Sequence, residues 1–375
     1  MDLLTHFCIL GSSMRVRIQV ITIALLFFGL ALFAWIKPAD AVSDSELRKL
    51  AQFPEISMDG ILSGEFARQF DDYAVDQFPL REKFRSIKAL TYTYVYGQLD
   101  NNGIYLQDGY AVKMEYPYDE SSVNYAVDRI NYIYDRYLAD SQTKCYVSII
   151  PDKNYYLASG HWALSMDYGK MIDDVRIGVK NCRYIDITDT LTIEDYYHTD
   201  THWDQSSITG VAEKLAGEMG TPLDDDYEIH EVTEPFYGVY YGQAALPIEP
   251  DKMKYLTLPC FDKVIVNDLQ NGKVIPIYDE GKMKTRSPYD LFLGGSLSLI
   301  TIENEEALTD KELIVFRDSY ASSLMPLLIS GYKKITIVDI RYLPSERVGN
   351  FVEFSDQDVL FIYSTSVLNH SSPLK

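Results

Sequence analysis

The sequence predicts an α/β fold with a parallel sheet flanked by helices, preceded by one N-terminal membrane segment. Three observations lead to this prediction. Continuous apolar runs at 313–316, 335–338 and 359–363 are typical of parallel strands that are buried on both faces. Segments of helical length separate these runs. Near the N-terminus, residues 18–36 contain no charge and are long enough to cross a hydrocarbon core about 30 Å thick.

The composition narrows the class of protein. Of the 375 residues, 47% are hydrophobic and 24% are charged, so the chain can bury a large core. The formal net charge is −21. Because such an excess of carboxylates repels a phosphate backbone, we expect no nucleic-acid partner.

The N-terminal residues predict a membrane topology. Residues 1–17 form a basic n-region, 18–36 form the membrane segment and 37–58 form a polar linker. Under the positive-inside rule, the n-region stays in the cytoplasm and the remaining domain, 59–375, lies outside it. We expect an uncleaved single-pass signal anchor in the cell membrane, because the apolar run exceeds the core of an ordinary signal peptide.

The sequence leaves alternatives for the cleavage of this segment and for the start of translation. Ala39-Asp40-Ala41 has the small-x-small form of a signal-peptidase site, and cleavage after Ala41 would make the protein secreted. Met14 opens a compact basic start, and we expect translation to begin there rather than at Met1.

Helices and strands alternate after the linker. Aromatic residues at helical spacing predict a helix from Phe66 to Phe84 with a break at Pro79. An Asp108-Gly109 turn between two β-prone runs predicts a hairpin over 103–114. The sequence then predicts, in order, a helix at 123–138, strands at 145–150 and 183–187, and a helix from about 205 to 218 with Asp204 as N-cap.

Residues 222–304 interrupt the alternation of helices and strands. They are rich in Gly, Pro and Tyr, and we expect them to form an insertion that shapes the rim of a cleft.

The cysteines are too few and too scattered for a disulfide-built scaffold or a zinc knuckle. Cys145 and Cys182 open two expected strands and could pair if those strands are neighbours. We favour the alternative that they are buried free thiols, as we expect for Cys260.

The sharpest group of functional side chains lies between the strand at 183–187 and the following helix. Residues two apart in an extended segment share a side, so Asp200 can orient the ring of His202 and stabilise its protonated form. Two alternatives stay open. The pair can be an ordinary helix cap, or His198, Asp200 and His202 can be alternating metal ligands. Because no further cluster completes a metal shell, we expect neither a metal nor a cofactor.

A nucleophile is expected at the C-terminal end of a buried strand, where α/β sheets expose reactive residues. Ser319 meets this condition, since the run at 313–316 ends there and a helix begins near Tyr320. Amide groups at the start of that helix would favour negative charge beside the hydroxyl. The alternative is that Asp318-Ser319 is a plain helix cap.

These segments resemble the SGNH/GDSL-type domain of the alginate O-acetylation proteins and the related DHHW family of Gram-positive bacteria. Asp200-Thr-His-Trp203 and the later Asp318-Ser319-Tyr320 carry the resemblance. Blocks similar to those of the family follow its order over nearly the whole exported part: FDDYAVDQFPLR (70–81), NGIYLQDG (102–109), IIPDK (149–153), TDTHW (199–203), FLGG (292–295) and VDIRY (338–342).

The resemblance implies a role for each residue of the triad. Ser319 would be the nucleophile, His202 the general base and Asp200 its orienting acid. Ordinary SGNH hydrolases place the Ser block first, so the order here implies the permuted arrangement of the acetylation branch. The oxyanion hole would combine the Ser319 amide with a second donor, for which Gly294 and Gly295 are candidates, although a glycine pair is also an ordinary turn.

Two departures from the family pattern affect the site. Arg317 stands where SGNH enzymes place Gly, and it can restrict or charge the cleft near Ser319. Thr201 replaces the second residue of the DHHW signature, as it does in the alginate branch.

The resemblance implies an O-acetyltransferase or acetylesterase that acts on a cell-surface or exported polysaccharide. The alternative is an inactive SGNH-fold protein that binds glycans or serves as a scaffold. The expected partners are the polysaccharide acceptor and a multi-spanning membrane acyltransferase. Residues expected to contact the substrate are Arg317 and the aromatic residues Trp203, Tyr320, Tyr240 and Tyr241. The aromatic rings can stack on sugars or simply pack in the core.

Overall fold

The computed structural model describes residues 3–43, 45–46, 48–158, 160, 162–285 and 287–375, with side chains from residue 14 onward. Met1, one of the two translation starts considered above, lies outside the described residues. Two compact units make up the chain, 1–91 and 92–375. The sequence assigned 59–375 to one domain, whereas the helices that follow the linker belong to the first unit.

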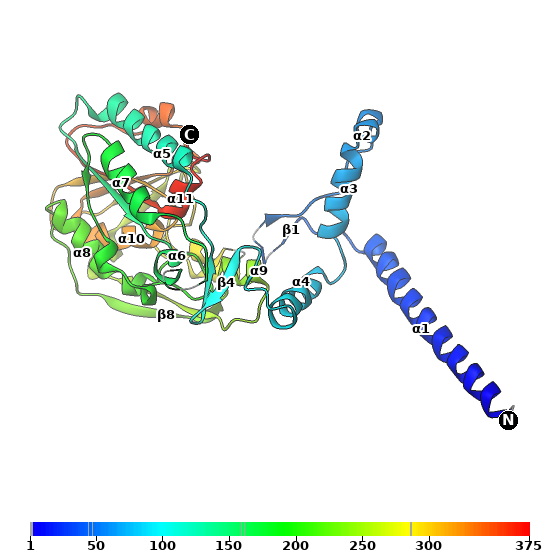
Figure 1. Ribbon diagram of the computed structural model, residues 1–375. Coiled ribbons are helices and arrows are strands. Elements are labelled where there is room, and N and C mark those ends of the chain that lie inside the picture. The colour runs from blue at the N-terminus through cyan, green and yellow to red at the C-terminus, as the bar shows by residue number, and fades with distance from the viewer. Residues whose placement is uncertain (1–2, 44, 47, 159, 161, 286) are drawn as a thin grey trace. The chain divides into compact units, whose positions relative to one another are not determined.

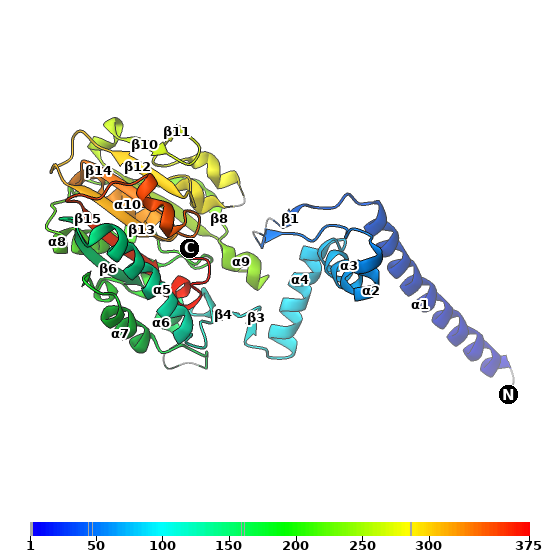
Figure 2. The same cartoon turned by 90° about the horizontal axis from the view of Figure 1, so that it is seen from above.

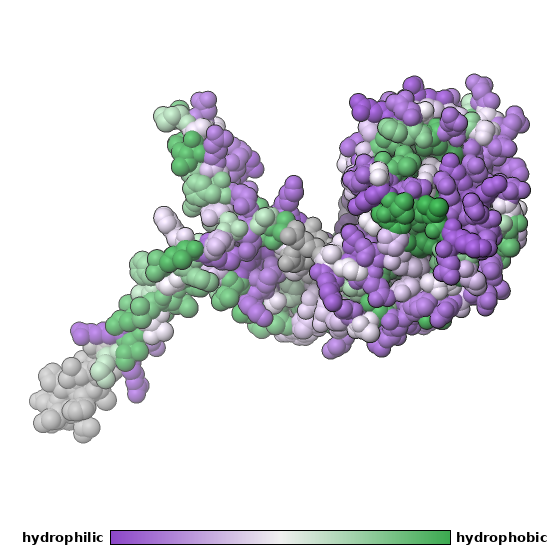
Figure 3. Space-filling view, turned by 180° about the vertical axis from the view of Figure 1, so that it is seen from behind, coloured by the Kyte–Doolittle hydropathy of each residue, from purple (hydrophilic) through white to green (hydrophobic). Residues whose placement is uncertain are grey.

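The first unit is mainly helical. Helix α1 spans Leu3–Ile36, and its part Met14–Ile36 is long and apolar enough to cross a membrane, by length and composition. Figure 3 shows hydrophobic side chains along this helix. The expected break at Pro79 separates α3 from α4. The other elements are β1 (Val42–Ser43), β2 (Arg48–Lys49), α2 (Met58–Ser63), α3 (Glu65–Asp76) and α4 (Arg81–Leu90).

The second unit is built on an eight-stranded sheet (Figures 1 and 2). Its order is β11-β10-β12-β14-β13-β15-β6-β7, and the five strands from β14 to β7 are parallel. The three apolar runs form β13 (Glu312–Arg317), β14 (Lys334–Val338) and β15 (Asp358–Ser364), as predicted. The strand predicted at 183–187 is shorter, since β7 spans Arg183–Tyr184. The remaining strands are β6 (Lys144–Ile150), β10 (Ile265–Asp268), β11 (Lys273–Ile275) and β12 (Leu299–Glu303).

Helices cover both faces of this sheet. On one face, α5 (Glu120–Ile133), α7 (Tyr168–Gly178) and α11 (Thr365–Asn369) pack against the strands. On the other face lie α8 (Thr209–Glu218) and α10 (Ala321–Leu328). The side chains packed between the sheet and the helices are apolar on both faces. This explains why the strands carry continuous apolar runs.

The region 222–304 does more than border a cleft. It supplies β10, β11 and β12, which extend the central sheet through antiparallel pairs. It also forms a separate hairpin of β8 (Glu228–Phe236) and β9 (Asp251–Thr257), with α9 (Val239–Ala244) between the two strands.

Smaller elements complete the second unit. The predicted hairpin is present as β4 (Ile104–Gln107) and β5 (Tyr110–Lys113), joined to β3 (Asp100–Asn101). Its turn needs Gly109, whose φ of 87° is open to glycine at no steric cost. Helix α6 (Lys153–Leu157) follows β6 directly.

Cys145 and Cys182 form a disulfide, so the free-thiol interpretation of this pair is wrong. Cys145 lies in β6, and Cys182 immediately precedes β7. Because β6 and β7 are paired neighbours, the two side chains meet. Cys260 is a free thiol, as expected.

Candidate active site

The loop 196–203 carries the Asp-x-His pair and is held from several directions. Its two ends meet in an isolated bridge between Tyr196 and Trp203. The carboxylate of Asp251, the first residue of β9, accepts hydrogen bonds from the backbone amides of His198 and Thr199, both at 2.8 Å. The loop therefore depends on the hairpin that the sequence places in the expected insertion.

Lys153 holds the loop from its other side. Its Nζ donates to the carbonyl oxygens of Tyr197 at 2.8 Å and His198 at 3.1 Å. The ammonium group also lies 5.1 Å from the centroid of the Tyr240 ring. Lys153 is 2% exposed, and this burial lowers the pKa of its amine to about 7.

Asp200, His202 and Ser319 form a continuous hydrogen-bonded chain. His202 Nδ1 lies 2.5 Å from Asp200 Oδ1, and His202 Nε2 lies 2.9 Å from Ser319 Oγ. The structure thus brings together the three side chains that the sequence singled out, in the geometry of a hydrolytic triad. The alternative that Asp200 and His202 only cap a helix does not account for the contact with Ser319.

Hydrogen bonds hold the Asp200 carboxylate in the position from which it orients the His202 ring. Its Oδ1 also accepts from the His202 amide at 3.0 Å, and Oδ2 accepts from the Val239 amide at 2.8 Å. Burial opposes ionisation, but the His202 ring and these amides outweigh it and lower the pKa of Asp200 below its usual value. The carboxylate is therefore ionised at neutral pH and accepts from the His202 ring.

Ser319 lies just beyond the C-terminal end of β13, the edge at which a parallel sheet presents reactive groups. The buried Asp318 fixes this turn, because its carboxylate accepts from the amides of Tyr320 and Ser364, at 3.0 and 2.7 Å. Among the described residues, the Ser319 amide has no hydrogen-bond acceptor. This amide is free to donate to a developing oxyanion.

The second oxyanion donor is not Gly295 as the structure stands. The Gly295 amide donates to the Phe292 carbonyl at 3.0 Å, and the Gly295 carbonyl accepts from Arg317 Nη2, also at 3.0 Å. This glycine is used within a turn, where its φ is 83°. Gly294, with a φ of 69°, stays a candidate.

Four of the five expected substrate contacts lie in the interior. Trp203 is fully buried, and its Nε1 donates to Tyr320 O and Ser323 Oγ. Tyr320 and Tyr240 are also buried, and both hydroxyls contact Thr201. Their faces are not available to a sugar in this structure.

Arg317 is likewise buried and does not charge the cleft directly. Its guanidinium donates to the carbonyl oxygens of Gly295 and Asp318 and lies 3.7 Å from the Asp339 carboxylate. Tyr241 differs from these residues, because it is partly exposed and packs on the exposed Tyr237. Tyr241 alone of the five is partly exposed.

Tyr289 is a site residue that the sequence analysis missed. It belongs to a 3₁₀ turn, Pro288–Leu291, and its ring stacks on His202 with 3.7 Å between the ring centroids. Its hydroxyl donates to Ser323 Oγ at 2.7 Å. The stack fixes the plane of the imidazole. No local pattern around Tyr289 indicates this contact.

The metal alternative gains no support from the geometry. In the part of the chain that the structure describes, no group of three or more His, Cys, Asp and Glu side chains is arranged to hold a metal. His198 Nδ1 lies 3.1 Å from Asp251, and its ring stacks on Tyr110, so its contacts are made with these two residues.

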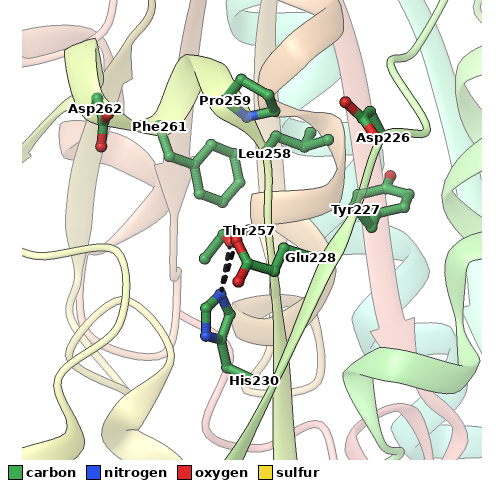
Figure 4. A pocket seen from close by; sticks show the side chains of 9 residues that line it. All are labelled: Asp226, Tyr227, Glu228, His230, Thr257, Leu258, Pro259, Phe261 and Asp262. Atoms are coloured by element: carbon green, nitrogen blue, oxygen red, sulfur yellow. Dashed lines mark hydrogen bonds and ion pairs between the residues drawn. The ribbon is translucent and has the colours of Figure 1, made fainter.

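A cavity of about 450 Å³ lies apart from these residues (Figure 4). It is bordered by the start of β8, the end of β9 and the 3₁₀ turn Pro259–Lys263. Figure 4 shows His230 joined to Thr257, a contact of 2.8 Å. No residue of the candidate triad lines this cavity.

Several solved structures are similar to this chain over most of its length. A DHHW family protein from Eubacterium siraeum matches with a TM-score of 0.56 and 18% identity, covering 73% of this chain and 95% of its own. Bacillus cereus PatB1 with a sulfonyl adduct matches with a TM-score of 0.55 and 19% identity, covering 71% and 95%. The O-acetyltransferase domain of Pseudomonas putida AlgJ gives a TM-score of 0.43 at 13% identity, covering 73% and 93%.

No protein-family model and no curated protein matches the sequence. The structural matches nevertheless extend over almost the full length of the DHHW family protein and of PatB1. The chain therefore has the α/β fold of the DHHW family protein and PatB1. Its largely parallel sheet flanked by helices is the architecture that the sequence predicted.

Proposed function

We propose that this chain is a membrane-anchored, extracytoplasmic O-acetyltransferase or acetylesterase that acts on a cell-surface or exported polysaccharide. The observation that carries the proposal is the hydrogen-bonded chain from Asp200 through His202 to Ser319 at the carboxyl edge of the sheet. The fold that the chain shares with PatB1 and the DHHW family protein supports the proposal. The resemblance of its motifs to those of the acetylation proteins also supports it.

In the first step, Ser319 Oγ attacks the carbonyl carbon of an acetyl ester while His202 Nε2 takes the hydroxyl proton. The Ser319 amide donates to the oxyanion. Collapse of the tetrahedral intermediate breaks the ester bond, and His202 returns the proton to the leaving alkoxide. Asp200 stabilises the imidazolium throughout.

In the second step, a hydroxyl group attacks the carbonyl carbon of the acetyl-serine while His202 takes its proton. The bond between the acetyl group and Ser319 Oγ then breaks, and His202 returns the proton to Ser319 Oγ. A sugar hydroxyl gives transfer, and water gives hydrolysis. A multi-spanning membrane acyltransferase is the proposed source of acetyl groups, and α1 is the proposed single-pass anchor, with residues after Ile36 outside the cytoplasm.

The test is hydrolysis of a chromogenic acetyl ester by the full-length protein in detergent. We expect acetate release in the wild type and its loss in Ser319→Ala and His202→Ala. Labelling by a sulfonyl fluoride should stop with Ser319→Ala, a probe chosen because PatB1 carries a sulfonyl adduct. Activity that persists in Ser319→Ala would exclude Ser319 as the nucleophile.

The second candidate is an inactive glycan-binding or scaffold protein. The observation in its favour is that the Gly295 amide is already used within its turn, so that only the Ser319 amide and the Gly294 candidate are left as oxyanion donors. A folded wild type that neither releases acetate nor reacts with the sulfonyl fluoride would support this candidate.

A further inference from the structure

The face of the central sheet that packs against α5, α7 and α11 changes character toward the amino ends of its parallel strands. One row across the sheet is apolar, with Leu299, Val338 and Phe316 aligned in register. The next row carries Thr301, Thr336 and Ile314 in the corresponding register. Two hydroxyl groups thus occupy positions where this face elsewhere buries apolar side chains.

These threonines form the floor of a groove of about 980 Å³. The segment 349–355 and Tyr137 border it on one side, and Leu269 lies on the other. Such a volume is at the upper end of ordinary ligand sites. Thr301 Oγ1 accepts from Asn267 at 3.5 Å, whereas the Thr336 hydroxyl has no partner among the described residues.

The residues that line the groove have no net formal charge, although the protein as a whole is strongly acidic. Arg136 and Lys334 line it together with Glu312 and Glu353, so its formal charge is zero while the chain carries −21. A strongly anionic or cationic ligand would leave some of these charges uncompensated. The lining therefore suits an uncharged, hydroxyl-rich molecule.

Backbone pairing excludes one other class of ligand. Strands β12, β14 and β13, which form the floor, are each paired on both sides. An extended peptide cannot add to them as a further strand, so the groove offers side chains alone. Hydroxyl, amide and aromatic side chains are offered here, including the Phe351 ring, which is 61% exposed at the rim.

We infer that this groove binds a neutral polysaccharide chain at a second site, separate from the candidate active site. Hydroxyl groups on the floor would exchange hydrogen bonds with sugar hydroxyls, and Phe351 would pack on a sugar face. The inference that the groove contacts the acceptor polymer rests on the proposed function.

The two sites lie at opposite ends of the same strand. Glu312 begins β13 and lines the groove, whereas Ser319 follows its end. At about 3.3 Å per residue, the separation is roughly 20 Å. A long polymer can engage both sites, but a short ester substrate cannot. The groove would therefore select acceptors by length.

The experiment is calorimetric titration of the full-length protein in nanodiscs with cellohexaose and chitohexaose, with a hexameric alginate as the charged comparison. We expect at least one neutral hexamer to bind more tightly than alginate. Thr301→Val combined with Thr336→Val keeps the shape and β-propensity of the floor and should weaken binding about fivefold or more. Phe351→Ala should weaken it by a similar factor.

The control locates the ligand. Thr257→Val removes a hydroxyl from the cavity of Figure 4 and should leave binding unchanged. Binding of neither neutral hexamer, or binding lost only in Thr257→Val, would overturn the inference. Displacement of the sugar by an extended Ser/Thr-rich peptide would also overturn it. Titration does not need ester hydrolysis, so failure of the proposed function would be seen separately.

Discussion

The ring of Tyr289 lies almost parallel to the imidazole of His202, with 3.7 Å between centroids and 7° between planes. The Tyr289 hydroxyl donates to Ser323 Oγ, which also accepts from Trp203 Nε1. Trp203, which is next to His202 in the sequence, and Tyr289, which is far from it, thus both bond to Ser323 of α10. This network fixes the base against the helix that follows the candidate nucleophile.

Loss of this stack should reduce catalysis. We expect Tyr289→Leu to lower kcat for a chromogenic acetyl ester about tenfold, because the imidazole loses one wall, with KM changed less. Tyr289→Phe keeps the ring and should cost about twofold to fivefold. Tyr255→Leu is the matched control, since Tyr255 stacks on His230 outside the site. Equal losses in Tyr255→Leu and Tyr289→Leu would contradict this role.

Gly238 leaves no room for a side chain beside Asp200. A Cβ there would lie 2.3 Å from Asp200 Cβ and 2.4 Å from its Cα. Gly238→Ala should therefore displace the orienting carboxylate, lowering the free energy of unfolding by about 1–3 kcal/mol and abolishing most ester hydrolysis.

Gly210→Ala provides the comparison for Gly238→Ala. Gly210 lies in α8 with nothing within 4 Å of an added Cβ, and the substitution should stabilise the protein by about 0.5–1 kcal/mol without changing activity. Urea unfolding and ester kinetics measure both effects. An active, stable Gly238→Ala variant would show that Asp200 tolerates displacement.

Lys153 makes stability depend on pH. Burial lowers the pKa of its amine to about 7, whereas the ordinary value is 10.5. Between these values the unfolded chain binds more protons, so the free energy of unfolding should rise with pH. This group should contribute a rise of about 2 kcal/mol from pH 7 to pH 9.

Lys153→Met should remove that rise. Urea unfolding of both proteins at pH 7, 8 and 9 isolates the effect, because other groups titrate in both. The neighbouring Asp152 has its pKa raised to about 6 by burial, so its own contribution is complete below this window. Parallel pH profiles for the two proteins would refute the assignment.

The disulfide should contribute measurably to stability. Cys145 and Cys182 are 37 residues apart, and a loop of this length corresponds to about 3–4 kcal/mol. Cys182→Ser should lower the free energy of unfolding by about this amount, and Cys260→Ser should have a much smaller effect. Alkylation of the denatured, unreduced protein should leave Cys145 and Cys182 unlabelled. Their labelling would show that the bond does not form.

The sequence was sufficient where local pattern and burial coincide. Strands β13, β14 and β15 were predicted because a parallel strand covered on both faces has little room for polar side chains. Asp200 and His202 could be paired because they are two residues apart in an extended loop. Ser319 was found by its position after a buried strand.

The remainder depends on contacts between distant residues. Tyr289 is far from His202 in the chain, and nothing near it distinguishes it from other tyrosines. The same limit applies to Trp203, Tyr240 and Tyr320, since an aromatic residue beside a reactive group can face the substrate or the core. Here all three are buried, and the polar atom of each side chain makes a hydrogen bond inside the protein.

The place of β15 in the sheet has a consequence for biosynthesis. It follows β6 by more than 200 residues in the sequence, yet it lies between β13 and β6, and Asp358 pairs with Lys144. Until residues 358–364 have been synthesised, β6 and β13 each have one edge without its partner. The parallel part of the sheet therefore cannot close in the order of synthesis. A premature stop before Asp358 would leave two unmatched strand edges, a state prone to self-association.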